Sequence, residues 1–207
     1  MSAWRPIELT GADVAIDPHW LPPRQANALF AALHAAVAWE THRIRLFGRE
    51  IDSPRLSCWI GDNDAAYTYS RMRFEPHPWP AALAPIRARL REETGVDFNG
   101  VLANLYRDGR DAMGWHSDSE PELGVRPVIA SLSLGATRRF VLKPITQSSQ
   151  TTALDLGSGS LLLMRGDTQH RYRHALPRTA KPVGARINLT FRRILPVGER
   201  GEERLAR

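Results

Sequence analysis

Hydrophobic residues recur at helical spacing in two stretches of the N-terminal half of the chain. The first stretch predicts a helix from Arg24 to Trp39, with apolar positions at Leu29, Phe30, Leu33 and Val37. The second predicts a helix from Pro80 to Glu93 that ends at Gly95, since proline favours the first turn of a helix and glycine its end. We therefore expect two helices before residue 96.

The rest of the N-terminal half has shorter patterns, which predict strands, turns and irregular segments. Residues 1–21 mix proline, aspartate and isolated hydrophobic residues, which predicts an irregular arm or a short strand. Residues 43–48 are basic and turn-rich, which is typical of a hairpin whose tip includes Phe47 and Gly48. A further strand is expected at residues 66–70.

From Phe98 onward the pattern changes to one strand after another, separated by turns and without an intervening helical period. The expected strands are 101–106, 128–134, 139–142, 160–164 and 186–192. This order predicts an α+β protein with a double-stranded β-helix (jelly roll) and the two helices packed outside it. A mixed α/β open sheet is the alternative, but it needs crossover helices that this half lacks. We expect one domain over 1–207, with an N-terminal extension over 1–95, a core over 96–195 and a tail over 196–207.

Composition adds a basic balance and a single cysteine. The 207 residues carry 28 basic and 22 acidic groups, a net charge of +6. This charge favours a polyanionic partner, although many basic proteins bind nothing acidic. Cys58 alone excludes an intramolecular disulfide and fits a reducing cytoplasm. Because no long apolar run or signal peptide is evident, we expect a soluble, cytoplasmic protein with no membrane partner. We further expect it to be a monomer.

The segment His116-Ser117-Asp118 is a candidate metal-binding motif. Residues two apart on a strand project to the same face, so this imidazole and this carboxylate can bind one metal. With a third histidine, they form the ligand set of non-haem Fe(II) oxygenases. The alternative is a hydrogen-bonded surface pair. Both His170 and His174 are candidates for the third ligand, and spacing does not choose between them.

The segment 186–192, Arg-Ile-Asn-Leu-Thr-Phe-Arg, alternates in the same way. Its polar side chains share one face, and its apolar side chains share the other. A face made of two arginines, an amide and a hydroxyl suits an anionic ligand, because guanidinium groups grip carboxylates bidentately. A solvated edge strand is the alternative. Asn104 and Tyr106 repeat the polar pattern just before the histidine–aspartate motif.

Four motifs of this chain, taken in order, resemble those of the AlkB family of Fe(II)/2-oxoglutarate dioxygenases. They are Asn-x-Tyr, His-x-Asp, Tyr-x-His-x-Leu-Pro and Arg-x-Asn-x-Thr-x-Arg. The motifs span residues 104–192. The resemblance implies Fe(II) as cofactor and 2-oxoglutarate and O2 as co-substrates. It implies His174, rather than His170, as the third metal ligand beside His116 and Asp118. It further implies a 2-oxoglutarate pocket made by Asn104, Tyr106, Arg186, Asn188, Thr190 and Arg192.

The N-terminal extension resembles the branch of that family that repairs duplex DNA. The resemblance implies a finger at residues 46–48 whose Phe47 and Gly48 fill the gap left by a flipped base. It implies a nucleotide-recognition lid with Tyr67 and Tyr69, and a base contact from Glu120. Buried hairpin or core aromatics are the alternative for Phe47 and both tyrosines. The cations expected to bind phosphate around the finger are Arg43, Arg45, Arg49 and Arg55.

The function implied is oxidative demethylation of 1-methyladenine and 3-methylcytosine in DNA, duplex or single-stranded, with release of formaldehyde and succinate. Ser119 stands where duplex-repairing relatives can have an acidic residue, which leaves the lesion preference open. A related oxygenase acting on RNA or protein is one alternative. A non-catalytic nucleic-acid-binding module is the other.

Overall fold

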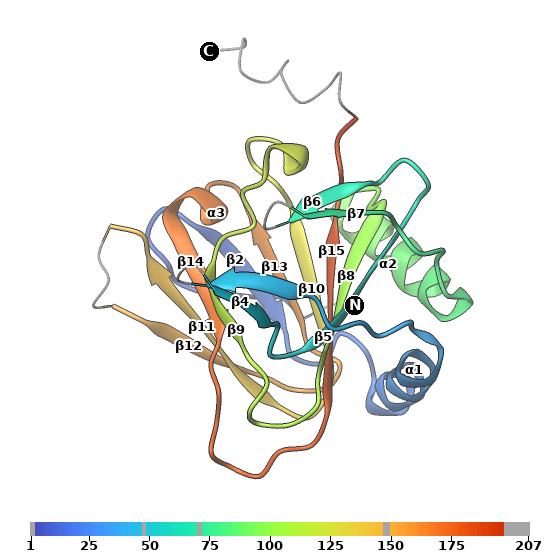
Figure 1. The fold of residues 1–207 in the computed structure, drawn as a ribbon. Helices are drawn as coiled ribbons and strands as arrows, with labels where there is room; N and C mark the ends of the chain where they lie inside the picture. Colours follow the sequence, from blue (N-terminus) through green and yellow to red (C-terminus); the bar gives the residue numbers. More distant parts are fainter. Residues whose placement is uncertain (1–2, 47–48, 70–71, 147–149, 197–207) are drawn as a thin grey trace.

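The computed structural model of the protein describes residues 3–46, 49–69, 72–146 and 150–196. The predicted finger tip, Phe47 and Gly48, therefore lies outside the described residues, as does nearly all of the predicted tail. Two β-sheets face each other, and two helices cover the outer face of the larger sheet (Figure 1). The expected jelly roll with external helices is confirmed.

The larger sheet has seven strands within the described residues, and all its pairs are antiparallel. In sheet order they are β1 (Arg5–Pro6), β2 (Asp13–Asp17), β13 (Leu161–Arg165), β10 (Ile129–Gly135), β15 (Arg186–Arg192), β8 (Gly100–Tyr106) and β5 (Leu56–Gly61). β15 thus lies inside the sheet, bonded to β10 on one side and β8 on the other.

The smaller sheet is also antiparallel and faces the inner surface of the larger one. Its strands are, in order, β12 (Thr152–Leu156), β11 (Arg138–Pro144), β14 (Tyr172–Leu176) and β9 (Met113–His116). Two separate hairpins pair β3 (Arg43–Leu46) with β4 (Arg49–Asp52) and β6 (Tyr67–Tyr69) with β7 (Met72–Phe74). The predicted finger and lid segments therefore both form two-stranded hairpins.

Helix α1 (Pro23–Ala36) and helix α2 (Ala84–Thr94) form one hydrophobic core with the outer face of the larger sheet. Leu29 and Leu33 of α1 and Leu90 of α2 are buried there. α2 follows a 3-10 turn, η1 (Ala81–Leu83), and ends at Gly95, whose φ of 70° is the left-handed conformation that glycine adopts readily. The two predicted helices are confirmed, although α1 ends three residues earlier than expected.

A second core fills the space between the two sheets. Its buried members include Leu102, Phe140, Leu142, Leu162 and Met164. β15 belongs to both regions: its apolar side chains join the helix-facing core, while its polar side chains point between the sheets. The alternative of a solvated edge strand is wrong, because all seven residues of β15 are buried.

Several elements differ from the prediction. Strands β5, β9, β12 and β14 were not expected, and a four-residue helix, α3 (Thr168–Arg171), interrupts the run of strands. A second short 3-10 turn, η2 (Pro121–Leu123), follows the histidine–aspartate motif. None of the described helices combines the length and apolar character that crossing a membrane requires.

Candidate metal centre and co-substrate pocket

Three potential metal ligands converge between the sheets. His116 ends β9, Asp118 lies two residues later, and His174 lies on β14, directly opposite His116 in the strand register. Their donor atoms all lie within 4.8 Å of one another. The Nε2 atoms of His116 and His174 lie 4.0 and 3.8 Å from the Asp118 carboxylate. The pairing of β9 with β14 thus brings together residues that are far apart in the sequence.

Hydrogen bonds orient two of these ligands. The Nδ1 atom of His116 lies 2.8 Å from the carbonyl oxygen of Gly114. Since a carbonyl oxygen only accepts, Nδ1 carries the proton and Nε2 keeps its lone pair for a metal. The backbone N–H of Asp118 donates to the side-chain oxygen of Gln169 at 2.9 Å. Both hydrogen bonds help to hold the metal-binding atoms of His116 and Asp118 toward the point where the three ligands converge.

The electrostatic environment favours the metal-binding protonation states. Burial alone would raise the pKa of Asp118, but Arg192 and the two imidazoles lower it to about 2. Burial is also the main reason why the pKa of His174 is lowered to about 3, and it lowers the pKa of His116 as well. At neutral pH the three groups are therefore one carboxylate and two neutral imidazoles, which are the forms that bind metal.

The polar face of β15 forms one wall of a pocket that opens onto the three ligands. The pocket is lined by all six predicted 2-oxoglutarate residues: Asn104, Tyr106, Arg186, Asn188, Thr190 and Arg192. Arg192 donates to the Asp118 carboxylate at 2.7 Å, so it touches the metal site directly. The structure thus brings the predicted pocket and the predicted metal ligands into one cavity.

Asn188 links the residues on either side of it along β15. Its side-chain oxygen accepts hydrogen bonds from Arg186 at 2.7 Å and from Ser131 at 3.1 Å. Its side-chain nitrogen donates to Thr190 at 2.8 Å. Because these contacts use both ends of the amide, we expect Asn188 to position Arg186 and Thr190 rather than to carry the main contact with a ligand.

Arg186 provides a test of whether the pocket suits a dicarboxylate. Its guanidinium is buried, and burial lowers its pKa to about 10. It donates to the Ser133 hydroxyl at 2.8 Å, but its Nε is buried without a hydrogen-bond partner among the described residues. A buried cation with an unused donor is costly unless an anion accompanies it. A ligand carboxylate at Arg186 would satisfy both needs, so the pocket fits 2-oxoglutarate.

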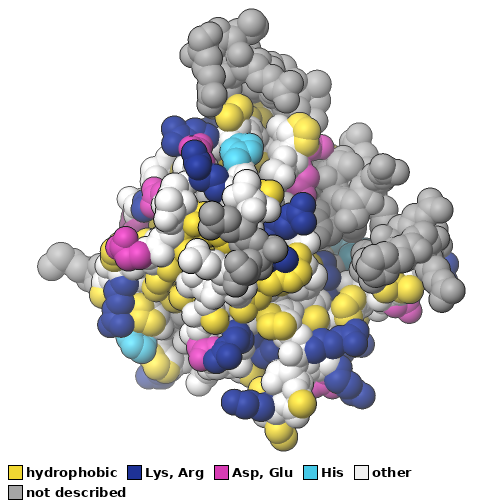
Figure 2. Space-filling model, turned by 90° about the vertical axis from the view of Figure 1, so that its left-hand side faces the viewer, with side chains coloured by type: hydrophobic (Ala, Val, Ile, Leu, Met, Phe, Trp, Pro, Cys, Tyr) yellow, Lys and Arg dark blue, Asp and Glu magenta, His cyan; other side chains and the backbone are white. Residues whose placement is uncertain are grey.

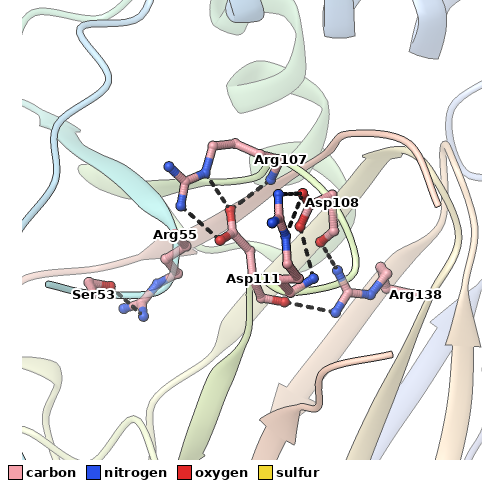
Figure 3. A network of polar contacts seen from close by, with 7 residues as sticks. Ser53, Arg55, Arg107, Asp108, Asp111 and Arg138 are labelled. Carbon is pink, nitrogen blue, oxygen red and sulfur yellow. Dashed lines mark hydrogen bonds and ion pairs between the residues drawn. The ribbon is translucent and has the colours of Figure 1, made fainter. Parts of the chain in front are cut away.

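Two guanidinium groups lie close to the Tyr106 ring. Arg186 lies 5.3 Å and Arg138 5.9 Å from its ring centre. Arg138 is buried and donates to the backbone carbonyl groups of Asp108 and Asp111 at 2.9 Å (Figure 3). It also donates to the carbonyl group of Pro177 at 2.8 Å. Arg138 therefore links the loop after β8 to the segment after β14, close to Tyr106.

The Asp111 side chain closes the same loop. It accepts hydrogen bonds from the backbone N–H and the guanidinium of Arg107 at 2.8–2.9 Å (Figure 3). The sequence analysis missed Arg138. The sequence does contain an indication of its burial. Residues two apart on a strand share a face, so Arg138 lies on the same inward face as Phe140 and Leu142, whereas Arg139 lies on the opposite face.

Arg55 corrects one prediction. It was expected to contact phosphate near the finger, but its side chain is only 6% exposed. Its Nε donates to the side-chain oxygen of Asn104 at 2.7 Å, and its Nη1 donates to the Ser53 hydroxyl at 3.0 Å. These contacts direct the buried Arg55 side chain toward the pocket, because Asn104 belongs to the pocket lining. Arg43, by contrast, is exposed, and it lies 4.0 Å from Asp52.

Among the described side chains, those of Glu120 and His170 are not part of the pocket lining. Glu120 is half-buried at the start of η2, and His170 is exposed and contacts the carbonyl oxygen of Val125. Tyr67 and Tyr69 lie on β6, but the structure does not describe their side chains, nor those of Arg45 and Arg49. Their contacts with a substrate stay predictions.

A jelly roll that holds two histidines and one aspartate beside an arginine-lined pocket has the architecture of a non-haem Fe(II) oxygenase. Residues 13–192 match the model of the 2OG-Fe(II) oxygenase superfamily. The chain belongs to this superfamily and, within it, to the AlkB family. The Fe(II) and 2-oxoglutarate that the superfamily's name specifies suit the donor set and the pocket described above.

Individual relatives support this assignment. The chain is 38% identical over 192 residues to the alpha-ketoglutarate-dependent dioxygenase alkB homolog 3 of Bos taurus, covering 88% of this chain and 66% of that protein. It is 36% identical over 203 residues to the DNA oxidative demethylase ALKBH2 of Homo sapiens, covering 93% and 77%. The chain thus spans slightly less than two thirds of the bovine relative.

A solved structure supports the fold alone. The structure of OsALKBH1 superimposes with a TM-score of 0.63 at 17% identity, covering 92% of this chain and 99% of that one.

Proposed function

We propose that the protein is an Fe(II)- and 2-oxoglutarate-dependent dioxygenase that removes N-methyl groups from nucleobases, with DNA as the main substrate. The observation that carries the proposal is the convergence of His116, Asp118 and His174 at one end of a pocket whose wall contains Arg186 and Arg192. The relative in Homo sapiens is named a DNA oxidative demethylase, and the one in Bos taurus is named a dioxygenase.

In this proposal His116, Asp118 and His174 hold Fe(II). Arg186 binds one carboxylate of 2-oxoglutarate, and Tyr106, Asn104 and Thr190 complete the pocket. Arg192 serves both groups, because it already contacts Asp118. Bound iron, with 2-oxoglutarate and O2, supplies the oxidising power that hydroxylates an N-methyl carbon, which then leaves the base as formaldehyde.

The substrate assignment rests on the N-terminal hairpins and on charge. The net charge of +6 favours a polyanion. We propose that the finger with Phe47 and Gly48 fills the gap left by a flipped base, and that Tyr67 and Tyr69 of the lid contact that base. Glu120 is the proposed partner of the positive charge that methylation adds to 1-methyladenine and 3-methylcytosine. Both duplex and single-stranded DNA would be substrates.

We also make proposals about the compartment in which the protein acts and about its oligomeric state. The single buried cysteine, Cys58, fits a reducing compartment, so we propose that the protein acts in the cytoplasm. We further propose that it acts as a monomer.

The test is an assay of formaldehyde and succinate with matched oligonucleotides that carry 1-methyladenine or 3-methylcytosine. We expect Fe(II)- and 2-oxoglutarate-dependent release with methylated DNA and none with the unmethylated control. Release only from methylated RNA or a methylated peptide would replace DNA with the other substrate class. Binding of DNA without any release of formaldehyde would identify a non-catalytic module.

A further inference from the structure

A second groove lies on the outer side of the candidate metal centre, where Trp115 is exposed. Strand alternation points His116 of β9 toward the other ligands and the preceding Trp115 away from them. Trp115 is 41% exposed, and Ile145 is 44% exposed. Both belong to the lining of one groove, which consists of Trp115, His116, Ser117, Ser119, Ile145, Gln169, His170 and Arg173. Among the described residues, three large hydrophobic side chains are exposed, and two of them therefore line this one groove.

Cations accompany the aromatic ring. The Lys143 ammonium of β11 lies 4.3 Å from the centre of the Trp115 ring. Arg173 of β14, which lines the groove, is directly opposite Lys143 in the strand register. Among the described residues neither cation has an ion pair with an acidic side chain. Like charges directly opposite each other destabilise a sheet, which an anion between them would relieve.

The same sheet offers a contrast. Arg139, also on β11, forms an ion pair with Asp155 of β12 at 3.2 Å. None of the described residues that line the groove is an aspartate or a glutamate. Figure 2 shows the side of the molecule on which β11, β12 and β14 lie, where Lys and Arg side chains are interspersed with hydrophobic ones. Within the described part of the chain, the positive charges of Lys143 and Arg173 beside Trp115 therefore lack an acidic partner, whereas the charge of Arg139 on β11 is paired.

We infer that this groove binds a nucleotide that flanks the target base on the substrate strand. An aromatic ring beside two cations is the combination that binds single-stranded nucleic acid, because the base stacks and the phosphate pairs with the cations. Trp115 stacks on the flanking base, while Lys143 and Arg173 contact the adjoining phosphate. His116 lines both this groove and the pocket at the metal centre, so a nucleotide in the groove would adjoin a base held at that centre. The inference rests on the proposed nucleic-acid substrate.

The first experiment measures binding by the Fe(II)- and 2-oxoglutarate-loaded protein without O2, using a fluorescent single-stranded 12-mer that carries 1-methyladenine. Trp115→Ala should raise Kd about tenfold, because stacking of one base contributes an effect of this order. Trp115→Phe should restore most of the affinity, since a smaller aromatic ring still stacks. An unchanged Kd for Trp115→Ala would overturn the inference.

The cations are tested by the salt dependence of the same Kd. The double variant Lys143→Gln/Arg173→Gln should reduce the slope of log K against log salt by roughly 0.7 for each phosphate that the protein no longer neutralises. Arg139→Gln is the matched control, because its charge lies on the same sheet but is already paired. An equal change in slope for the control would count against the groove as the phosphate site.

A turnover assay separates this inference from the proposed function. With the mononucleotide 1-methyl-dAMP, which has no flanking base, Trp115→Ala should keep the kcat/KM of the wild type, while with the 12-mer it should lose activity. Equal loss on both substrates would indicate damage to the metal site and overturn the inference. If the wild type releases no formaldehyde from either substrate, the proposed function fails, and the Kd measurements still decide whether the groove binds nucleic acid.

Discussion

The guanidinium Nε of Arg55 donates a 2.7 Å hydrogen bond to the side-chain oxygen of Asn104. Arg55 follows the closing end of the β3–β4 hairpin, where the Ser53 N–H donates to the His42 carbonyl at 2.8 Å. Asn104 lines the proposed co-substrate pocket. Because the amide oxygen accepts from Arg55, its nitrogen is left to donate to an anion in the pocket. The base of the predicted finger and the pocket are therefore in direct contact.

Arg55→Ala should raise the KM for 2-oxoglutarate roughly tenfold to a hundredfold, since a hydrogen bond to a charged group contributes about 1.5–3 kcal/mol. The kcat at saturating 2-oxoglutarate should change little. Succinate release at varied 2-oxoglutarate gives both values. Arg43→Ala, on the exposed side of the same hairpin, is the control and should keep the KM of the wild type. A change confined to the KM for DNA would instead support the original phosphate assignment.

Replacing the two candidate third ligands separately should distinguish them. His174→Ala removes a donor from the converging triad and should abolish formaldehyde release, as should Asp118→Ala. His170→Ala changes an exposed side chain that faces the outer groove and should leave iron binding intact. Iron content after gel filtration, together with formaldehyde release, checks this. An active Asp118→Ala variant would remove the basis of the ligand assignment.

Arg186→Gln should separate folding from ligand binding. The variant removes a desolvated cation, so the free protein should be at least as stable as the wild type. It should lose binding of 2-oxoglutarate, because the bidentate donor is gone. A ligand at 100 times its Kd stabilises a protein by about 2.7 kcal/mol, which shifts the Tm of a chain this size by about 5–10 °C. Thermal unfolding should show this shift in the wild type but not in the variant.

Cys58 should resist alkylation while the protein is folded. Burial, with a smaller effect from Glu40, raises its pKa to about 12 from an ordinary value of 9.0. The thiolate, which is the reactive form, is therefore scarce at pH 8. Iodoacetamide should label the single cysteine quickly in denaturant and negligibly in buffer, as mass spectrometry would show.

The same shift predicts how stability changes at high pH. The pKa of Cys58 is higher in the folded protein than in the unfolded chain. Its contribution to the free energy of unfolding is therefore complete below pH 9 and is lost as pH rises toward 12. Cys58→Ala should flatten the pH dependence of the free energy of unfolding in this range. Equal slopes in the two proteins would show that other groups control alkaline unfolding.

Phe47→Ala should impair demethylation of duplex DNA more than that of single-stranded DNA. In the proposed mechanism Phe47 fills the gap left by the flipped base, which exists only in a duplex. Rates on matched oligonucleotides give the comparison. Equal loss on both would argue against the wedge.

The sequence predicted the features that depend on local periodicity. The alternation of Arg186 to Arg192 was sufficient to assign the two faces of β15, and both assignments are confirmed by the cores on either side. The helical spacing of Leu29 and Leu33 likewise predicted α1 correctly. These patterns need no information about partners, because a buried face leaves a repeat in the sequence itself.

Features that depend on long-range pairing were missed. β9 is only Met113-Gly-Trp-His116, too short and too mixed to show a period, and it is a strand because β14 pairs with it. The burial of Arg55 follows from β5 pairing with β8, which places Ser57 opposite Asn104. The sequence alone favours an exposed position for an arginine beside a hairpin. Here the surrounding sheet, rather than the local pattern, determines its contacts.

The position of β15 restricts how this pocket can diversify. A one-residue insertion or deletion would exchange the two faces of the strand, so that Ile187 and Phe191 would face the pocket and Arg186 and Arg192 the helices. Such a chain would lose its core and its ligand clamp together. A point replacement in β15 leaves this alternation intact, whereas a change in length would have to be accommodated in the connections outside the strand.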